Sequence, residues 1–204
     1  AINSQKDIFC ERVFAPALDM ENIMREKKIP LFSLESKTPL KEADVIGFTL
    51  QYELSYSNIL NMLDLSNIPL LSKERDNTHP FICAGGPCAY NPEPLADIID
   101  FFILGEGETI NVEIMKKHIL WKESGKEKFE FLKDIAQIQG VYVPSLYDAS
   151  YDENNTIHTL DKLYAWAPDQ IMKNIEPDLD EAFYPEKFIV PYIDVVHNRA
   201  VVEI

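Results

Sequence analysis

The sequence predicts an α/β fold, in which a sheet of mostly parallel strands has helices on both faces and a small β-rich annex follows at the C-terminal end. Strand-like and helix-like stretches alternate through the first 125 residues, an order typical of a parallel sheet with crossover helices. The runs at residues 44–50 and 100–104 are almost wholly apolar, as expected for strands covered on both faces. From residue 141 onward, short alternating stretches predict the annex.

The composition is that of a globular chain with an acidic surface. Of 204 residues, 46% are hydrophobic and 26% charged, and the formal net charge of -15 would repel a phosphate backbone, which excludes nucleic acid as a partner. The longest apolar stretches, such as residues 101–104, fall far short of the roughly 20 residues that a membrane span requires. Cys10, Cys83 and Cys88 are an odd number without a disulfide spacing, which favours reduced thiols and a cytoplasmic location.

The first part of the chain predicts two strands and one helix. Residues 10–15 form the first strand. Asp19 is a candidate N-cap for a short helix that runs to Lys28, where basic side chains favour the C-terminal end. Residues 44–50 form the second strand, and we expect it to be central because its apolar run is nearly continuous.

The middle of the chain continues the alternation. Ser55 or Ser57 caps a helix that ends near Asn67. Residues 80–84 predict the next strand, and residues 91–98 predict a short helix with proline in its first turn.

A further strand and two helices complete the sheet region. Residues 100–104 predict a buried strand, and residues 109–121 predict a helix with apolar residues on one face. A second helix lies between Gly125 and Gly140.

We divide the chain into a sheet domain, residues 1–140, and an annex with a linker, residues 141–204. The annex begins with strands at residues 141–143 and 145–151. Residues 152–155 (Asp-Glu-Asn-Asn) predict a hairpin turn after them.

The glycines indicate a candidate binding site. The chain has only 7 glycines, and four of them follow two predicted strands directly, in Gly85-Gly86-Pro87 and Gly105-Glu106-Gly107. Loops beyond the carboxyl ends of parallel strands form the ligand crevice of such sheets, and glycine lets a ligand approach the backbone. We therefore expect the two loops side by side at one crevice, although tight turns alone would also explain the glycines.

The residues near these loops narrow the class of ligand. Glu106 and Glu108 would repel a phosphate, so a neutral ligand with hydroxyl or amide groups fits better, and Glu106 is the stronger candidate contact. Glu108 is equally explained as a first-turn carboxylate that stabilises a helix dipole. Tyr52 and Tyr56 follow the strand at 44–50, where they either line a flat ligand or pack in the core.

Other motifs of known chemistry are missing. The chain has no dinucleotide fingerprint, phosphate-loop lysine or nucleophile elbow. His79, Cys83 and Cys88 do not have the spacing of zinc ligands, and His118 and His197 are interpreted as structural or surface residues. We predict no catalytic residue and no metal ligand.

Six stretches carry a resemblance to a known family, and they lie along nearly the whole chain. They are CERVFAP (10–16), GFTLQYELSY (47–56), AGGPCAYNPEPLAD (84–97), GEGE (105–108), QGVYVPSLY (139–147) and PYIDVVH (191–197). They resemble the N-terminal part of the bacterial cobalamin-binding-domain radical S-adenosylmethionine (radical SAM) proteins, which are Fe-S oxidoreductases.

The resemblance implies a Rossmann-like domain of the flavodoxin-like or cobalamin-binding type, with cobalamin as its cofactor. It also implies a following barrel that holds a 4Fe-4S cluster on a Cys-x-x-x-Cys-x-x-Cys motif and cleaves S-adenosylmethionine. This motif is not in the chain, and we expect it shortly after residues 202–204, so the barrel of the same polypeptide is the expected partner. The family pattern also has a strand and a helix before the stretch that matches residues 2–7, and we expect this chain to lack both.

The candidate site residues follow from the glycine loops and the resemblance together. The cofactor-binding candidates are Gly85, Gly86, Pro87, Gly105, Glu106, Gly107 and Tyr52. Several cobalamin proteins carry Asp-x-His-x-x-Gly, whose histidine is the lower axial ligand of cobalt. Asp194-Val-Val-His197 has a different spacing and no following glycine, so no axial ligand is assigned.

Three functions compete at this point. The preferred one is a cobalamin-binding-like accessory domain without catalysis of its own, within a radical SAM enzyme. The alternative is a module of the same fold that docks a substrate or partner and no longer binds cobalamin. The third is a small α/β enzyme with Glu106 as general base, which has the least support because no second acid–base group lies near it.

The expected lack of a first strand has a consequence for the sheet. It would leave the edge of the strand at residues 44–50 unpaired, and such an edge recruits another strand. The candidates to pair with this edge are residues 10–15, residues 189–204, or a second copy of the chain in a homodimer. We also expect any bound cobalamin to be held more weakly without the first strand's loop.

Overall fold

The fold is described by a computed structural model, which covers residues 1–178, 180, 182 and 183. Its strands are β1 (Val45–Thr49), β2 (Phe81–Gly85), β3 (Phe101–Ile103), β4 (Val141–Tyr142), β5 (Tyr147–Tyr151) and β6 (Ile157–Lys162). Its α-helices are α1 (Leu18–Lys27), α2 (Tyr56–Leu65), α3 (Ile110–Ser124) and α4 (Lys128–Ile135).

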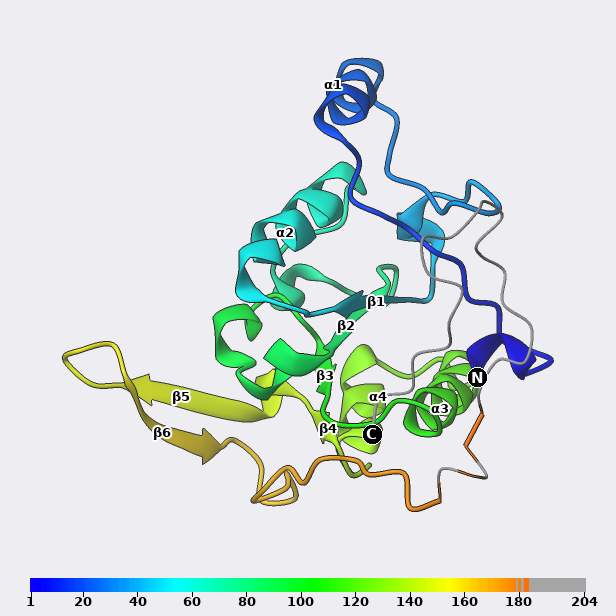
Figure 1. Ribbon diagram of the computed structural model, residues 1–204. Coiled ribbons are helices and arrows are strands. Elements are labelled where there is room, and N and C mark those ends of the chain that lie inside the picture. The colour runs from blue at the N-terminus through cyan, green and yellow to red at the C-terminus, as the bar shows by residue number, and fades with distance from the viewer. Residues whose placement is uncertain (179, 181, 184–204) are drawn as a thin grey trace, which may run out of the picture.

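The described sheet has the order β1-β2-β3-β4 (Figure 1). Strands β1, β2 and β3 are parallel, and β4 is antiparallel to β3. Strands β5 and β6 form a separate antiparallel hairpin that projects from the body of the protein. The α/β class, the helices on both faces and the small β-rich annex are confirmed.

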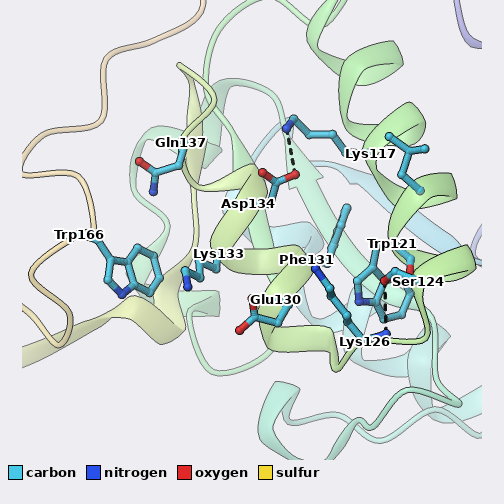
Figure 2. Close-up of a pocket in the computed structure, with 11 residues that line it drawn as sticks. Lys117, Trp121, Ser124, Lys126, Glu130, Phe131, Lys133, Asp134, Gln137 and Trp166 are labelled. Carbon is cyan, nitrogen blue, oxygen red and sulfur yellow. Dashed lines mark hydrogen bonds and ion pairs between the residues drawn. The ribbon is translucent and has the colours of Figure 1, made fainter.

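Helices α3 and α4 cover one face of the sheet. Phe81 of β2 and Phe101 of β3 alternate with residues of the opposite face and pack against Phe131 of α4, with the Phe81 and Phe131 ring centroids 4.5 Å apart. Lys117 of α3 pairs with Asp134 of α4 at 2.9 Å on the outside of this layer (Figure 2).

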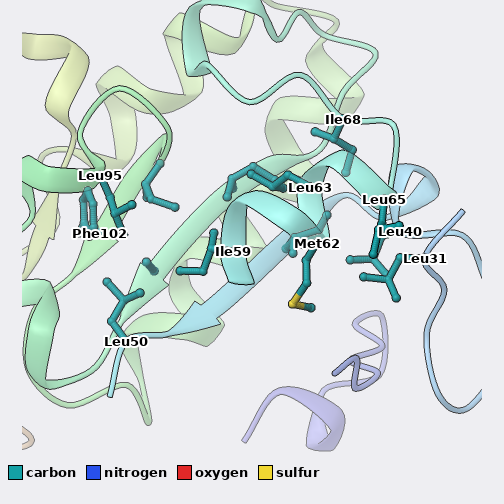
Figure 3. Packing of buried hydrophobic residues seen from close by; sticks show 14 of the residues in the cluster. Leu31, Leu40, Leu50, Ile59, Met62, Leu63, Leu65, Ile68, Leu95 and Phe102 are labelled. Carbon is teal, nitrogen blue, oxygen red and sulfur yellow. The ribbon is translucent and has the colours of Figure 1, made fainter. Parts of the chain in front are cut away.

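Helix α2 covers the other face. Ile59, Met62 and Leu63 lie on one side of this helix at helical spacing and pack on sheet residues that include Phe102 (Figure 3). Leu63 is fully buried. Strand β2 therefore lies between two apolar layers, which explains its unbroken apolar sequence.

A buried ion pair joins the amino ends of β2 and β3. Arg75 Nη2 lies 3.2 Å from Asp100 Oδ1, and the two side chains are 0% and 5% exposed. Asp100 Oδ2 also accepts the Ile82 N–H at 2.6 Å. Arg75 Nη1 donates to the carbonyls of Pro69 and Leu70 at 3.0 and 2.9 Å, so one guanidinium fixes the connection before β2.

A buried lysine attaches α4 to the same end of the sheet. Lys128 Nζ donates to the carbonyls of His79 and Pro80 at 3.0 and 3.1 Å and lies 4.2 Å from the centre of the Phe81 ring. Burial lowers the pKa of Lys128 to about 8, because the charged form loses most of its hydration.

Three predictions near the N-terminus need correction. Residues 10–15 form no strand among the described residues. The Arg12 side chain and N–H bind the Glu35 carboxylate, and the Arg12 carbonyl accepts the Leu34 N–H. Asp19 lies in the first turn of α1, and Ala17 occupies the N-cap. Ser55 does stand at the N-cap of α2, but its hydroxyl donates to the carbonyl of Tyr52.

Among the described residues, the strand at 44–50 does not have the central position that its sequence predicts. Strand β1 lies at the edge of the described sheet. Its apolar run arises because Val45 contacts the layer of α3 and α4 while Ile46 contacts the layer of α2, and Thr49 is exposed.

Two further elements differ from expectation. Residues 91–98 form a 3-10 turn, Glu93–Leu95, rather than a helix, since prolines at 92 and 94 offer no N–H. Residues 141–142 join the main sheet as β4, although the pattern placed them in the annex. The hairpin turn at 152–155 is confirmed, and the expectation for residues 189–204 lies outside the described residues.

The Arg75–Asp100 pair predicts a large stability loss when it is broken. Arg75→Met leaves the buried Asp100 carboxylate without its counter-charge, and we expect a loss of about 3–5 kcal/mol in the free energy of unfolding. Arg25→Met is the control, since Arg25 is 44% exposed in its pairs with Glu21 and Asp64, and its loss should lower the stability far less than the loss of Arg75. Urea unfolding measures both, and equal losses would contradict the assigned role.

The buried Lys128 predicts a pH dependence. Folded Lys128 releases its proton near pH 8, whereas the unfolded chain keeps it up to the ordinary pKa of 10.5. The unfolded state therefore binds more protons in this window, and the stability of the wild type rises with pH relative to Lys128→Met. The difference between their unfolding free energies should grow between about pH 7 and about pH 10. A difference independent of pH would show that Lys128 is not perturbed by burial.

Candidate functional site

The carboxyl ends of three parallel strands meet at one edge of the sheet. In the register of the strands, Thr49 lies opposite Gly85 and Gly85 lies opposite Ile103. The loops that follow β1, β2 and β3 are therefore neighbours. The prediction that the two glycine loops lie side by side at this edge is confirmed.

The loop after β2 is shaped by contact with the loop after β1. Gly86 has a φ of +103°, and a Cβ there would lie 3.0 Å from the carbonyl oxygen of Leu50. Leu50 also accepts the Cys88 N–H at 3.0 Å. Pro87 then opens the 3-10 turn Pro87–Tyr90. The glycine is required here by the chain's own backbone.

The loop after β3 is covered by a distant part of the chain. Residues 171–176, which we call the strap, run across it, and Asn174 forms a parallel bridge with Gly105. Gly105 has a φ of +97°, and a Cβ there would lie 2.0 Å from the Asn174 carbonyl oxygen. Only glycine fits beneath the strap.

Glu106 faces the strap with its backbone and its side chain. Its N–H donates to the Asn174 carbonyl at 3.1 Å, and its own carbonyl accepts Asn174 Nδ2 at 2.7 Å. Its Oε2 accepts the N–H of Glu176. Glu108 lies two residues further along and precedes Thr109, the N-cap of α3, so its interpretation as a first-turn carboxylate is wrong; Glu113 is the acidic residue of that turn. The Glu108 Oε2 atom is buried without a hydrogen-bond partner among the described residues.

The aromatic candidates separate into two roles. Tyr52 is 56% exposed in the loop after β1, so its ring is available at the edge. Tyr56 is half-buried and packs on the layer of α2, which is the core alternative. Gly107 is also partly buried and its carbonyl accepts the Asn111 N–H at the start of α3.

The thiols near the edge are poor nucleophiles. Burial raises the pKa of Cys83 to about 12. Partial desolvation and the Glu53 carboxylate raise the pKa of Cys88. Both thiols stay protonated near neutral pH, and only the thiolate reacts readily.

The edge offers groups for binding a ligand. Within the described part of the chain, no group of three or more His, Cys, Asp or Glu side chains is placed to hold a metal ion. His79 binds Asp76 instead, with Nδ1 2.8 Å from Oδ1, at the opposite edge of the sheet. What the three loops present is backbone donors and acceptors, the Glu106 carboxylate and the Tyr52 ring.

Two cavities that the sequence did not indicate lie away from this edge. One of about 460 Å³ lies between α3, α4 and Trp166 (Figure 2). Another of about 470 Å³ lies before β1 and β2, with His118 and Lys122 in its wall. Burial lowers the pKa of His118, whose ring packs edge-on to Phe81. No short motif marks either cavity, because the wall residues come from separate elements.

The fold defines an α/β domain in which the loops after three parallel strands are neighbours at the carboxyl ends of those strands. The chain matches the family described as "Radical SAM proteins, N-terminal" over residues 1–144, and it belongs to that family. The match covers β1 to β4 and stops before the hairpin and the strap.

One curated relative matches part of the chain. An uncharacterized protein of Methanocaldococcus jannaschii is 34% identical over 90 residues, which are 43% of this chain and 18% of that protein. The match therefore spans about a fifth of the relative's length. No solved structure matches the chain. Within the described residues, none of the helices combines the length and the apolar character that crossing a membrane requires.

Proposed function

We propose that this chain is an accessory domain that binds cobalamin at the carboxyl edge of its sheet, within a radical SAM protein whose catalytic barrel follows in the same polypeptide. The observation that carries the proposal is the meeting of three loops at this edge, in a chain of the radical SAM N-terminal family. Ligands of open parallel sheets bind beyond the carboxyl ends of the strands.

The residues at the edge fit the periphery of a corrin. In this proposal the flat corrin lies beside the exposed Tyr52 ring. Its carboxamide side chains bond to the Glu106 backbone in place of Asn174, which occupies that backbone in the structure. In this proposal, the corrin lies against the backbone of the two glycine loops, which comprises Gly85, Gly86, Pro87, Gly105 and Gly107. When bound, cobalamin supplies a cobalt centre that carries an alkyl group. This chain's own residues hold and orient it.

The parent protein's chemistry belongs to the proposed barrel. There, a 4Fe-4S cluster on three cysteines would cleave S-adenosylmethionine, and this chain would position a cofactor or substrate beside it. The thiols of the described residues do not supply such a cluster site, since the Cys83 side chain is enclosed in the sheet.

A docking module is the second candidate. The strap favours this alternative, because the Asn174 carbonyl oxygen already occupies the position closest to the Gly105 backbone, where a ligand would have to lie. In this alternative, the same fold docks a substrate or partner onto the barrel and binds no cobalamin.

Titration with hydroxocobalamin tests the proposal. We expect the visible spectrum of the corrin to change on saturable binding, with a modest affinity. Tyr52→Ala should raise Kd about tenfold, equivalent to about 1.4 kcal/mol, because a stacked ring is lost. Tyr151→Ala is the control, since Tyr151 is similarly exposed at 53% but lies on the hairpin. No saturable change, or equal effects of both variants, would favour the docking module.

A further inference from the structure

The strap occupies the part of the proposed crevice that follows β3. We propose that the strap is an autoinhibitory cover, which competes with a carboxamide-bearing ligand for the backbone of residues 104–106 and leaves that loop when the ligand binds. This inference rests on the proposed function, and it adds a ligand group and a mode of regulation to the same site.

Asn174 uses the hydrogen-bonding groups that a ligand would need. Its N–H donates to the Leu104 carbonyl at 2.8 Å, and its carbonyl accepts the Glu106 N–H at 3.1 Å. Its side-chain Nδ2 donates to the Glu106 carbonyl at 2.7 Å. A ligand carboxamide has the same donor and acceptor, so strap and ligand cannot both occupy this place.

The loop is also shaped for a close approach. The Asn174 carbonyl oxygen stands only 2.0 Å from the position of a Cβ on Gly105. A loop with an ordinary side chain at this point would hold both the strap and a ligand away from its backbone. Gly105, which was predicted to admit a ligand, is therefore in contact with the strap. Asn174 of the strap carries the same carboxamide group as the proposed ligand.

The attachment of the strap is mostly polar. Gln139 Nε2 donates to the Lys173 carbonyl at 2.9 Å, and Thr109 Oγ1 donates to Glu176 Oε2 at 3.1 Å. Met172 and Ile175 are 58% and 56% exposed, and Ile171 packs partly on the layer of α2. Each hydrogen bond near solvent contributes little net stability, so the strap can open while the core stays folded.

Weakening the strap from its own side tests the competition. Asn174→Ala removes the side-chain bond to Glu106 and leaves the crevice residues unchanged. We expect the population of open strap to rise about two- to tenfold, as the loss of one hydrogen bond implies. Limited trypsin digestion of the 204-residue chain should cleave after Lys173 faster by this factor. The Kd for hydroxocobalamin should fall by the same factor, since ligand binds only the open state.

Two controls and one further variant complete the experiment. Met172→Ala changes an exposed strap residue without a side-chain hydrogen bond among the described residues and should alter neither readout. Gly105→Ala should release the strap by collision and accelerate cleavage after Lys173. Its control is Gly125→Ala, where φ is +64° but nothing lies within 4 Å of the added Cβ.

The outcomes separate this inference from the proposed function. Faster cleavage with an equal gain in affinity supports the cover. If the wild type binds hydroxocobalamin and Asn174→Ala binds it no better despite faster cleavage, the cover is overturned and the cobalamin proposal stands. If no variant binds hydroxocobalamin although the strap opens, both are overturned. Unchanged cleavage in Asn174→Ala and Gly105→Ala also overturns the cover.

Discussion

The geometry of the sheet depends on the buried contact between Arg75 and Asp100. Asp100 holds the Ile82 N–H with one carboxylate oxygen and Arg75 with the other, so the amino ends of β2 and β3 are locked together. A buried pair of this kind contributes little net stability against a matched apolar pair, but it admits one arrangement of its partners. The register of β2 and β3 places Gly85 opposite Ile103 at the other end of the strands. We infer that the Arg75–Asp100 contact favours this register, and with it the meeting of the loops that follow the two strands.

Much of the sheet could be predicted, because a run of apolar residues indicates a strand that is buried on both faces. The runs at 80–84 and 100–104 became β2 and β3, and the glycines after them lie together because parallel strands share a carboxyl edge. Residues 10–15 show the limit, since their pattern shows an extended chain but not whether another backbone pairs with it. The edge position of β1 was also hidden, because contacts with two cores give an edge strand the composition of a central one.

The sequence predicts where the candidate site lies, but not which group occupies it. A glycine after a strand indicates that something approaches the backbone closely, without saying what does so. At Gly105 the approaching group is Asn174, 69 positions along the chain, beyond the reach of any local pattern. The family match ends at residue 144, so the strap lies outside the region that the family shares. The family region thus builds the edge, and a later segment of this chain covers part of it.

Native-state hydrogen exchange under increasing denaturant shows whether the strap opens while the sheet core stays folded. We expect the amides of Ile82 and Asp100 to exchange only through global unfolding, with the full free energy of unfolding. The amides of Asn174 and Glu106, which hold the strap, should exchange through a local opening at least about 1–2 kcal/mol less costly and nearly insensitive to denaturant. If all four amides exchange with the same free energy and the same denaturant dependence, the strap is an integral part of the core and does not open independently.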